Sequence, residues 1–262
     1  MTDFGWVPAG IDVNQPSAAR VYDYHLGGRH HFPADRWVAE QAAVRLPELP
    51  ATVRAHRAFL QRAVRYLCAA GVRQFLDLGS GMPTAGHVHE IAGTIDPRAR
   101  VVYVDVDPVA VAHGEALLAD IGTAAIVRAD LRDIPLVLAA PPVRRLLDVT
   151  EPVGVLMVAV LHLLTDADDP AGVVARYRDA MPAGSHLVAS APRGRTRRAS
   201  THRGFTINSR QAPADDITAW FAGWDLVEPG ITRIGRWHPD KDSAVTAEPE
   251  QVADLGGVAR KP

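Results

Sequence analysis

The chain has 262 residues, 47% of them hydrophobic, so it is long enough to bury the core of one large α/β domain. Its 28 basic and 30 acidic residues give a formal charge of −2, which does not indicate a nucleic acid or a membrane as partner. The single cysteine, Cys68, excludes an internal disulfide, and no apolar run reaches about 18 residues, so we expect a soluble, unprocessed protein of the reducing cytoplasm.

The first fifty residues predict a helical cap. Residues 17–26 and 34–46 have helical patterns, separated by a break at Gly27 and Gly28. A longer pattern over residues 51–70 repeats apolar side chains at helical spacing and ends at Gly71. We expect this third helix to lead directly into the first strand of the main domain.

From residue 73 onward, short β-branched runs alternate with helical stretches. This alternation predicts an α/β fold with a mostly parallel sheet and helices on both faces. The expected strands cover residues 73–78, 100–105, 124–129, 153–160 and 185–191. The expected helices between them cover residues 84–93, 108–120 and 170–181.

The C-terminal part gives weaker signals. Residues 193–204 contain five arginines and suggest a solvated loop or a site for an anionic acceptor, followed by a helix over 214–223. Residues 224–237 predict two strands that pair through a turn at Pro229 and Gly230. We therefore expect three parts: a cap over 1–50, a Rossmann-like domain over 51–237 and a loosely ordered polar tail over 238–262.

The most informative motif follows the first expected strand. Asp77 ends that strand, and Gly79, Ser80 and Gly81 follow it. Two glycines spaced by one residue let the backbone turn sharply and approach a ligand at the carboxyl edge of the sheet. By itself this spacing is weak evidence, because an ordinary strand-to-helix turn also explains it.

Two further strands also end in aspartate. Asp105 ends the second strand, where a carboxylate can accept hydrogen bonds from both hydroxyls of a ribose, and Asp130 follows the third. Asp107 precedes Pro108 and is better explained as the N-cap of the next helix than as a second ribose ligand.

A nicotinamide or flavin enzyme is the competing interpretation. Its Gly-x-Gly-x-x-Gly loop brings a helix N-terminus to a pyrophosphate. Here Thr84 occupies the position of the third glycine, and Asp77 would repel a phosphate. A positively charged sulfonium nucleoside fits these residues better.

The same three turns resemble those of class I S-adenosylmethionine methyltransferases, which have a Rossmann-like, mostly parallel seven-stranded sheet. The resemblance extends over nearly the whole chain to a bacterial family once catalogued as a domain of unknown function. It rests on the unusual Gly-x-Pro-Thr loop at 81–84, the tyrosine and glycine segment at 16–28, and the runs 103–108, 129–132, 158–162 and 166–170. It implies S-adenosyl-L-methionine as cofactor and the following binding set: Asp77, Gly79, Ser80, Gly81, Asp105, Val106, Asp107, Asp130, Leu131 and Ala159.

The cap completes the expected site. The strand ends supply mostly acids, so the cofactor's own carboxylate needs a donor from outside the sheet. We expect residues 16–28 to fold over the sheet edge and supply it through Arg20, with Tyr22 and Gly28 also near the cofactor.

The acceptor is not specified by the sequence. His162 follows the fourth strand and is the candidate general base, although a structural or pocket-lining role is the better explanation of a histidine at this position. His30 and His31 lack the cysteines or paired carboxylates of a metal site, so we expect no metal. We expect transfer to a small-molecule acceptor; the alternative is a regulatory protein that binds the cofactor without transferring its methyl group.

Overall fold

The structure, a computed structural model, describes residues 11–82, 86–194, 197–202, 205–210, 212–239 and 252–262, the ranges 197–202 and 205–210 by their backbone alone. Its helices are α1(Ala18–His25), α2(Pro33–Arg45), α3(Leu49–Ala69), α4(Val88–Ile95), α5(Pro108–Leu118), α6(Ile134–Ala139), α7(Pro141–Leu146), α8(Pro170–Ala180) and α9(Ala214–Trp220), with 3-10 turns η1(Leu161–Leu163), η2(Asp166–Asp168) and η3(Ile234–Arg236). Its strands are β1(Gln74–Leu78), β2(Arg100–Asp105), β3(Ala124–Arg128), β4(Gly154–Val158), β5(His186–Ala191), β6(Arg197–His202), β7(Phe205–Arg210), β8(Asp225–Leu226), β9(Thr232–Arg233) and β10(Leu255–Arg260).

The main sheet confirms the expected α/β class. Its order is β3-β2-β1-β4-β5-β10-β8, with β9 also paired to β10. The first five strands in this order run parallel, whereas β10 is antiparallel to β5. The chain reverses its winding direction between β1 and β4, and open α/β sheets bind ligands beside such a switch point.

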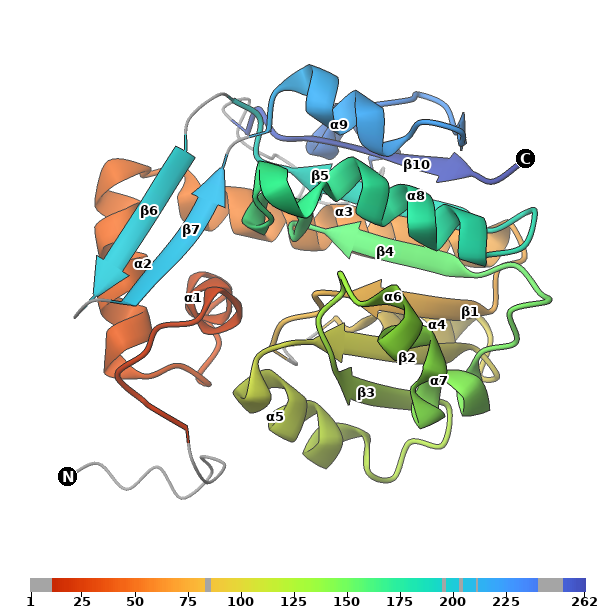
Figure 1. The fold of residues 1–262 in the computed structure, drawn as a ribbon, viewed down its shortest axis with the longest axis horizontal. Coiled ribbons are helices and arrows are strands. Elements are labelled where there is room, and N and C mark those ends of the chain that lie inside the picture. Colours follow the sequence, from red (N-terminus) through yellow and green to blue (C-terminus); the bar gives the residue numbers. More distant parts are fainter. Residues whose placement is uncertain (1–10, 83–85, 195–196, 203–204, 211, 240–251) are drawn as a thin grey trace.

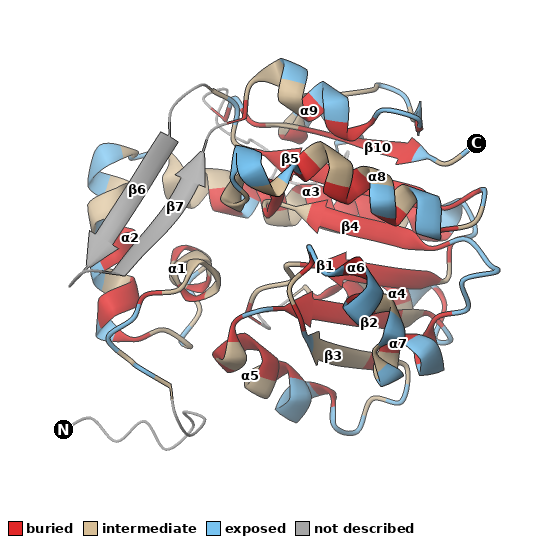
Figure 2. Cartoon of the chain, in the orientation of Figure 1, coloured by how far each residue is buried: buried red, intermediate tan, exposed pale blue. Residues whose placement is uncertain are grey.

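Helices cover both faces of this sheet, and its central strands β1, β2, β4 and β5 are almost entirely buried, whereas the edge strand β3 is only partly buried (Figures 1 and 2). On one face α6 to α9 enclose a core that includes Met157, Tyr177 and Trp220. On the other, α3 packs through Phe59 and Leu67. No helix in the described residues is long and apolar enough to cross a membrane.

The cap lies at the carboxyl ends of the parallel strands. Figure 1 shows α1, α2 and the β6–β7 hairpin gathered at the ends toward which β1, β2 and β4 point. Helix α1 contacts α2 and α3, and β7 contacts η1 after β4. Helix α1 of the segment 16–28 thus lies near this edge of the sheet.

The C-terminal predictions need three corrections. The predicted loop at 193–204 contains β6, which pairs with β7 as an antiparallel hairpin. Strands β8 and β9 do not pair with each other, because each pairs with β10 instead. The predicted loose tail is wrong for β10, which lies inside the main sheet between β5 and β8; residues 240–251 of that tail lie outside the described residues.

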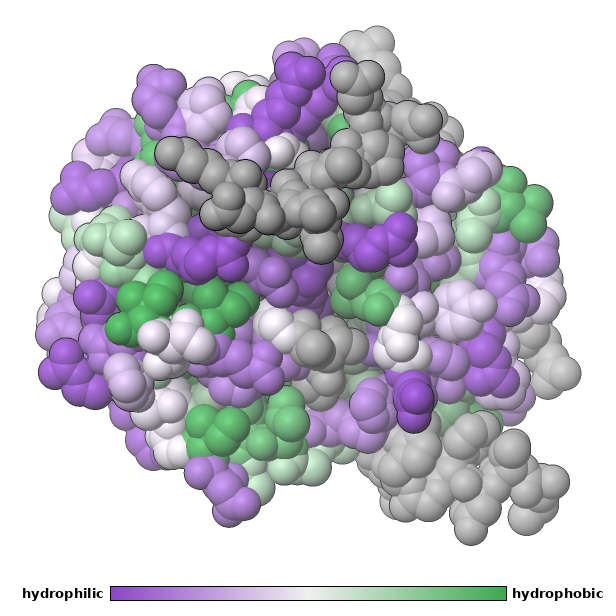
Figure 3. Space-filling view, turned by 180° about the vertical axis from the view of Figure 1, so that it is seen from behind, coloured by the Kyte–Doolittle hydropathy of each residue, from purple (hydrophilic) through white to green (hydrophobic). Residues whose placement is uncertain are grey.

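The face of the molecule seen from behind carries hydrophobic side chains in separate small groups between hydrophilic ones (Figure 3). Scattered groups of this kind are normal on a protein surface. This view therefore gives no broad apolar patch from which to infer a partner.

Candidate active site

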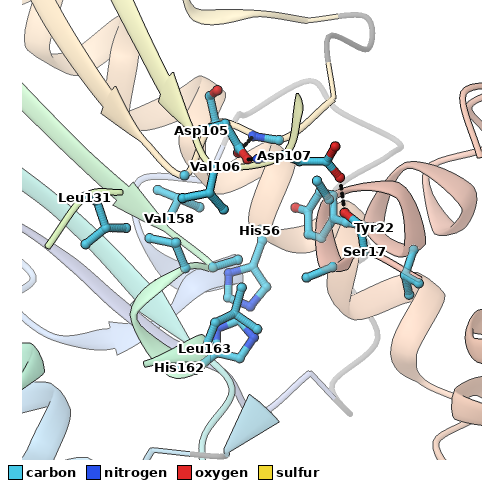
Figure 4. Close-up of a pocket in the computed structure, with 18 of the residues that line it drawn as sticks. Ser17, Tyr22, His56, Asp105, Val106, Asp107, Leu131, Val158, His162 and Leu163 are labelled. Carbon is cyan, nitrogen blue, oxygen red and sulfur yellow. Dashed lines mark hydrogen bonds between the residues drawn. The ribbon is translucent and has the colours of Figure 1, made fainter. Parts of the chain in front are cut away.

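A cavity of about 450 Å³ opens where the cap meets the carboxyl edge of the sheet (Figure 4). The turns after β1, β2, β3 and β4 line one half, which we call the sheet-edge half. Residues of α1, α2, α3 and η1 line the other, which we call the cap half. The volume is in the range of small-ligand sites. From the predicted binding set it brings together Tyr22, Asp77, Gly79, Ser80, Gly81, Asp105, Val106, Asp107, Asp130, Leu131 and Ala159, with the candidate base His162.

The glycine loop has the conformation that the motif predicts. Gly79 and Gly81 have φ of +73° and +71°, which side-chain-bearing residues rarely adopt. A Cβ added at Gly79 would also lie 2.3 Å from a methyl group of Val160. The loop can thus follow this path, close to the cavity, only with glycine at position 79.

Asp105 organises the same loop. One of its carboxylate oxygens accepts a hydrogen bond from the Gly81 amide and the other accepts one from the Asp107 amide, both at 2.8 Å. Burial raises the pKa of Asp105, while these amides lower it. A carboxylate offers about four lone-pair sites, so it retains capacity to accept from a ligand hydroxyl beside these backbone amides.

Asp77 is a buried acid on the wall of the cavity. Burial raises its pKa to about 7; the Arg57 guanidinium lowers it and the Asp105 carboxylate raises it further. An ammonium group bound beside it would favour the charged carboxylate.

This pKa predicts that cofactor affinity depends on pH. A cationic amino group such as that of S-adenosylhomocysteine, placed beside Asp77, would bind its ionised form, which is lost as the pH falls below about 7. Titration calorimetry should therefore give a Kd roughly tenfold higher at pH 6 than at pH 8. In Asp77→Asn the affinity should be lower and this pH dependence absent; an unchanged pH dependence in the variant would assign it to another group.

The predicted role of Arg20 is wrong, because its guanidinium is buried in an ion network outside the cavity lining. Its Nε donates to Asp35 at 2.8 Å, its Nη1 donates to Asp107 at 3.0 Å, and its Nη2 donates to the carbonyl of Gln15. All of these hydrogen-bond acceptors belong to the protein, so the Arg20 guanidinium already has its partners within the fold. Asp107 also accepts from the amide of Val109, which confirms its expected role as the N-cap of α5.

Gly28 is also absent from the cavity wall. Its amide donates to the carbonyl of Asp23 at 2.9 Å, and a Cβ there would lie 2.0 Å from the Asp23 carboxylate. A glycine is needed at this turn for packing against α1. Of the two tyrosines on α1, Tyr22 lines the cavity, whereas the Tyr24 hydroxyl donates to Glu40.

The third strand end carries a charged cluster. Arg132 donates to Asp130 at 2.9 Å and also to Asp168. Its contact lowers the pKa of Asp130, while hydrogen bonds from Thr165, and then the one from Arg132, lower the pKa of Asp168. Asp130 and Leu131 line the cavity beside this cluster. Val106, which follows β2 and is 58% exposed, is a second apolar side chain, beside Leu131, that a flat ligand ring could contact.

Arg57 is a site residue that sequence reasoning missed. It lines the cavity from α3, and its guanidinium lies 6.0 Å from the centre of the Tyr22 ring. No local motif marks it, since residues 51–70 show only a helical apolar pattern. It is a cation from outside the sheet, the kind of group that we expected from the cap.

Two histidines line the cavity beyond the turn after β4 (Figure 4). Burial lowers the pKa of His162 to about 4, so this imidazole is neutral at physiological pH. His56 bonds through Nδ1 to the Ser190 hydroxyl at 2.8 Å and through Nε2 to Asp254 at 2.9 Å. Ala159, which also lines the cavity, has φ of +54°, a strained conformation of the kind that concentrates at functional sites.

The parallel sheet, the glycine turn and the strand-end acids together define a Rossmann-like protein that binds a nucleoside cofactor. The S-adenosyl methyltransferase family model matches residues 5–262. The chain therefore belongs to this family and is an S-adenosylmethionine-dependent methyltransferase. The cofactor inferred from the sequence is thus correct.

Solved structures agree with this assignment. A DUF574 family protein from Streptomyces avermitilis is 36% identical with a TM-score of 0.86, and the match covers 96% of this chain and 99% of that one. A putative methyltransferase from Thermobifida fusca has the same identity and TM-score and covers 98% of both chains. A putative S-adenosylmethionine-dependent methyltransferase from Listeria monocytogenes, at 13% identity, TM-score 0.53 and coverage of 79% and 98%, shares the fold. Curated protein sequences give no match.

Proposed function

We propose that this protein transfers the methyl group of S-adenosylmethionine by in-line displacement to a small-molecule acceptor bound in the cap half of the cavity. One observation carries the proposal: a single cavity joins the strand ends that suit the cofactor to a separate wall formed by the cap. The continuous space allows the sulfonium and an acceptor atom to meet without water between them.

The sheet-edge half, together with Arg57 from α3 in the cap half, accounts for each part of the cofactor. Asp105 accepts from the ribose hydroxyls, and Asp77 faces the amino group. Arg57 takes the role that we had assigned to Arg20 and binds the carboxylate. The adenine lies beside the apolar side chains of Val106 and Leu131, with Asp130 at its edge.

His162 is the proposed general base. The acceptor oxygen or nitrogen attacks the methyl carbon while the bond from that carbon to sulfur breaks, and sulfur keeps the electron pair in neutral S-adenosylhomocysteine. The acceptor proton passes to a ring nitrogen of His162. No described residue hydrogen-bonds this ring, and its neutral form leaves a lone pair for the proton.

Replacement of His162 should lower turnover and leave cofactor binding intact. A positioned base contributes about 10²- to 10⁴-fold. His162→Gln should therefore reduce kcat by at least about a hundredfold, with the Kd of S-adenosylhomocysteine changed less than about threefold. A kcat within threefold of the original would exclude His162 as the base and leave it a lining residue.

Release of S-adenosylhomocysteine tests the function itself. The protein is incubated with S-adenosylmethionine carrying a labelled methyl group and a panel of small metabolites, and both the product and the label in each acceptor are measured. Stoichiometric transfer to one acceptor supports the proposal. Tight cofactor binding with no transfer to any acceptor would favour the regulatory alternative.

A further inference from the structure

The cap half of the cavity differs in charge from the sheet-edge half. The cavity-lining carboxylates all belong to the sheet side, on Asp77, Asp105, Asp107, Asp130 and Asp168. The described residues that line the cap half contribute no carboxylate. They are mainly aliphatic: Val21, Val38, Ala42, Leu49, Val53, Leu60, Leu163 and Leu164.

Most polar groups of the cap half already have a function within the protein. The Tyr22 hydroxyl donates to the carbonyl of Val53 at 3.1 Å. Both ring nitrogens of His56 are bonded, to Ser190 and to Asp254. Arg57 faces the cofactor's carboxylate in the proposed function. None of these groups requires a polar partner from the acceptor.

Two imidazoles are different. His25, 7% exposed at the end of α1, and His162 after β4 both line the cavity, and no described residue hydrogen-bonds either ring. A buried polar group without a partner is costly, so these rings lie where a ligand or water should supply one. Burial lowers the pKa of both histidines, and Arg54 lowers that of His25 further, so they act as neutral partners.

We propose that the methyl acceptor is an uncharged, mainly apolar compound that presents a hydroxyl group to His162 and a second hydrogen-bonding group to His25. This inference rests on the proposed function. A cationic acceptor would lose its hydration beside an apolar wall that offers no countercharge. An anionic acceptor would compete with the cofactor's carboxylate for Arg57. An uncharged hydroxyl compound has neither of these free-energy costs.

Three probes of one shape test the charge of the acceptor: 2-naphthol, 2-naphthoate and 2-naphthylmethylammonium, which are neutral, anionic and cationic at pH 7.5. Their binding to the complex with S-adenosylhomocysteine is measured by fluorescence, independently of turnover. We expect 2-naphthol to bind at least tenfold more tightly than either charged probe. Equal or tighter binding of a charged probe, or no binding of 2-naphthol at millimolar concentration, would overturn the proposal.

Variants locate the contacts. His162→Phe should weaken 2-naphthol by about fivefold to tenfold but leave naphthalene, which lacks the hydroxyl, unchanged. His25→Phe should leave both nearly unchanged, because 2-naphthol lacks the second hydrogen-bonding group that His25 would contact. Thr52→Asp places a carboxylate in the cap half and should raise the affinity for the ammonium probe at least tenfold over Thr52→Asn, its neutral control. Equal ammonium binding by these two variants would overturn the placement of the acceptor in the cap half.

The complex also separates this inference from the proposed function. Binding of S-adenosylhomocysteine is measured first by calorimetry. If it fails, the cofactor assignment of the sheet-edge half fails. If the cofactor binds and the naphthalene probes do not discriminate, only the acceptor class is wrong.

Discussion

Replacing Arg20 with alanine should destabilise the fold by about 3–5 kcal/mol, the usual cost of removing one partner from a buried ion network. The Arg20 side chain is 5% exposed and bridges Asp35, which is fully buried, and Asp107, which caps α5. Without the guanidinium two carboxylates remain buried with reduced compensation. The loss also removes the Arg20 links from α1 to α2 and to the turn after β2.

Urea unfolding and calorimetry measure the effect, with an expected fall in Tm on the order of 10 °C. Arg100→Ala is the control, because Arg100 pairs with the exposed Glu151 at 3.4 Å and its loss should leave Tm nearly unchanged. Arg57→Ala is the functional comparison. It should raise the Kd of S-adenosylhomocysteine strongly and lower Tm only a little. If Arg20→Ala has no larger effect on Tm than Arg100→Ala, the ion network is not a structural element of the fold.

The error over Arg20 shows a limit of sequence reasoning. The cofactor's carboxylate needs a donor from outside the sheet, and Arg20 is the arginine in the segment that we expected to cover the site. Its partners Asp35 and Asp107 are 15 and 87 residues away, and no local pattern announces such pairs. Arg57 could not be predicted either. Packing of the whole domain sets the rotation of α3 against the sheet edge, and this rotation decides which residues of α3 face the cavity.

The strand ends were predictable because their geometry is local. A parallel strand that ends in Asp77 or Asp105 places the acid at the carboxyl edge whatever the rest of the chain does.

Strand β10, in contrast, could not be predicted from local sequence. Gly256 and Gly257 resemble a break in the sequence, yet a Cβ at Gly256 would lie 2.8 Å from the Cβ of Ser190, so glycine is required by close approach to β5.

Asp105→Asn should raise the Kd of S-adenosylhomocysteine by about tenfold to a hundredfold, equivalent to about 1.5–3 kcal/mol for lost charge-assisted hydrogen bonds. Two effects combine. The amide removes the charge that favours bonds from the ribose hydroxyls. In addition, its NH₂ group cannot accept, so either the Gly81 amide or the Asp107 amide loses its present partner.

Asp107→Asn is the matched control for this prediction. Asparagine still caps a helix and can accept from Val109, but it weakens the pairing with Arg20. We therefore expect a lower Tm with a Kd changed by less than about threefold, the reverse of the pattern for Asp105→Asn. Titration calorimetry and thermal unfolding on both variants separate the two roles. A larger loss of affinity in Asp107→Asn would mean that Asp107, at the start of α5, is the acid that holds the ribose.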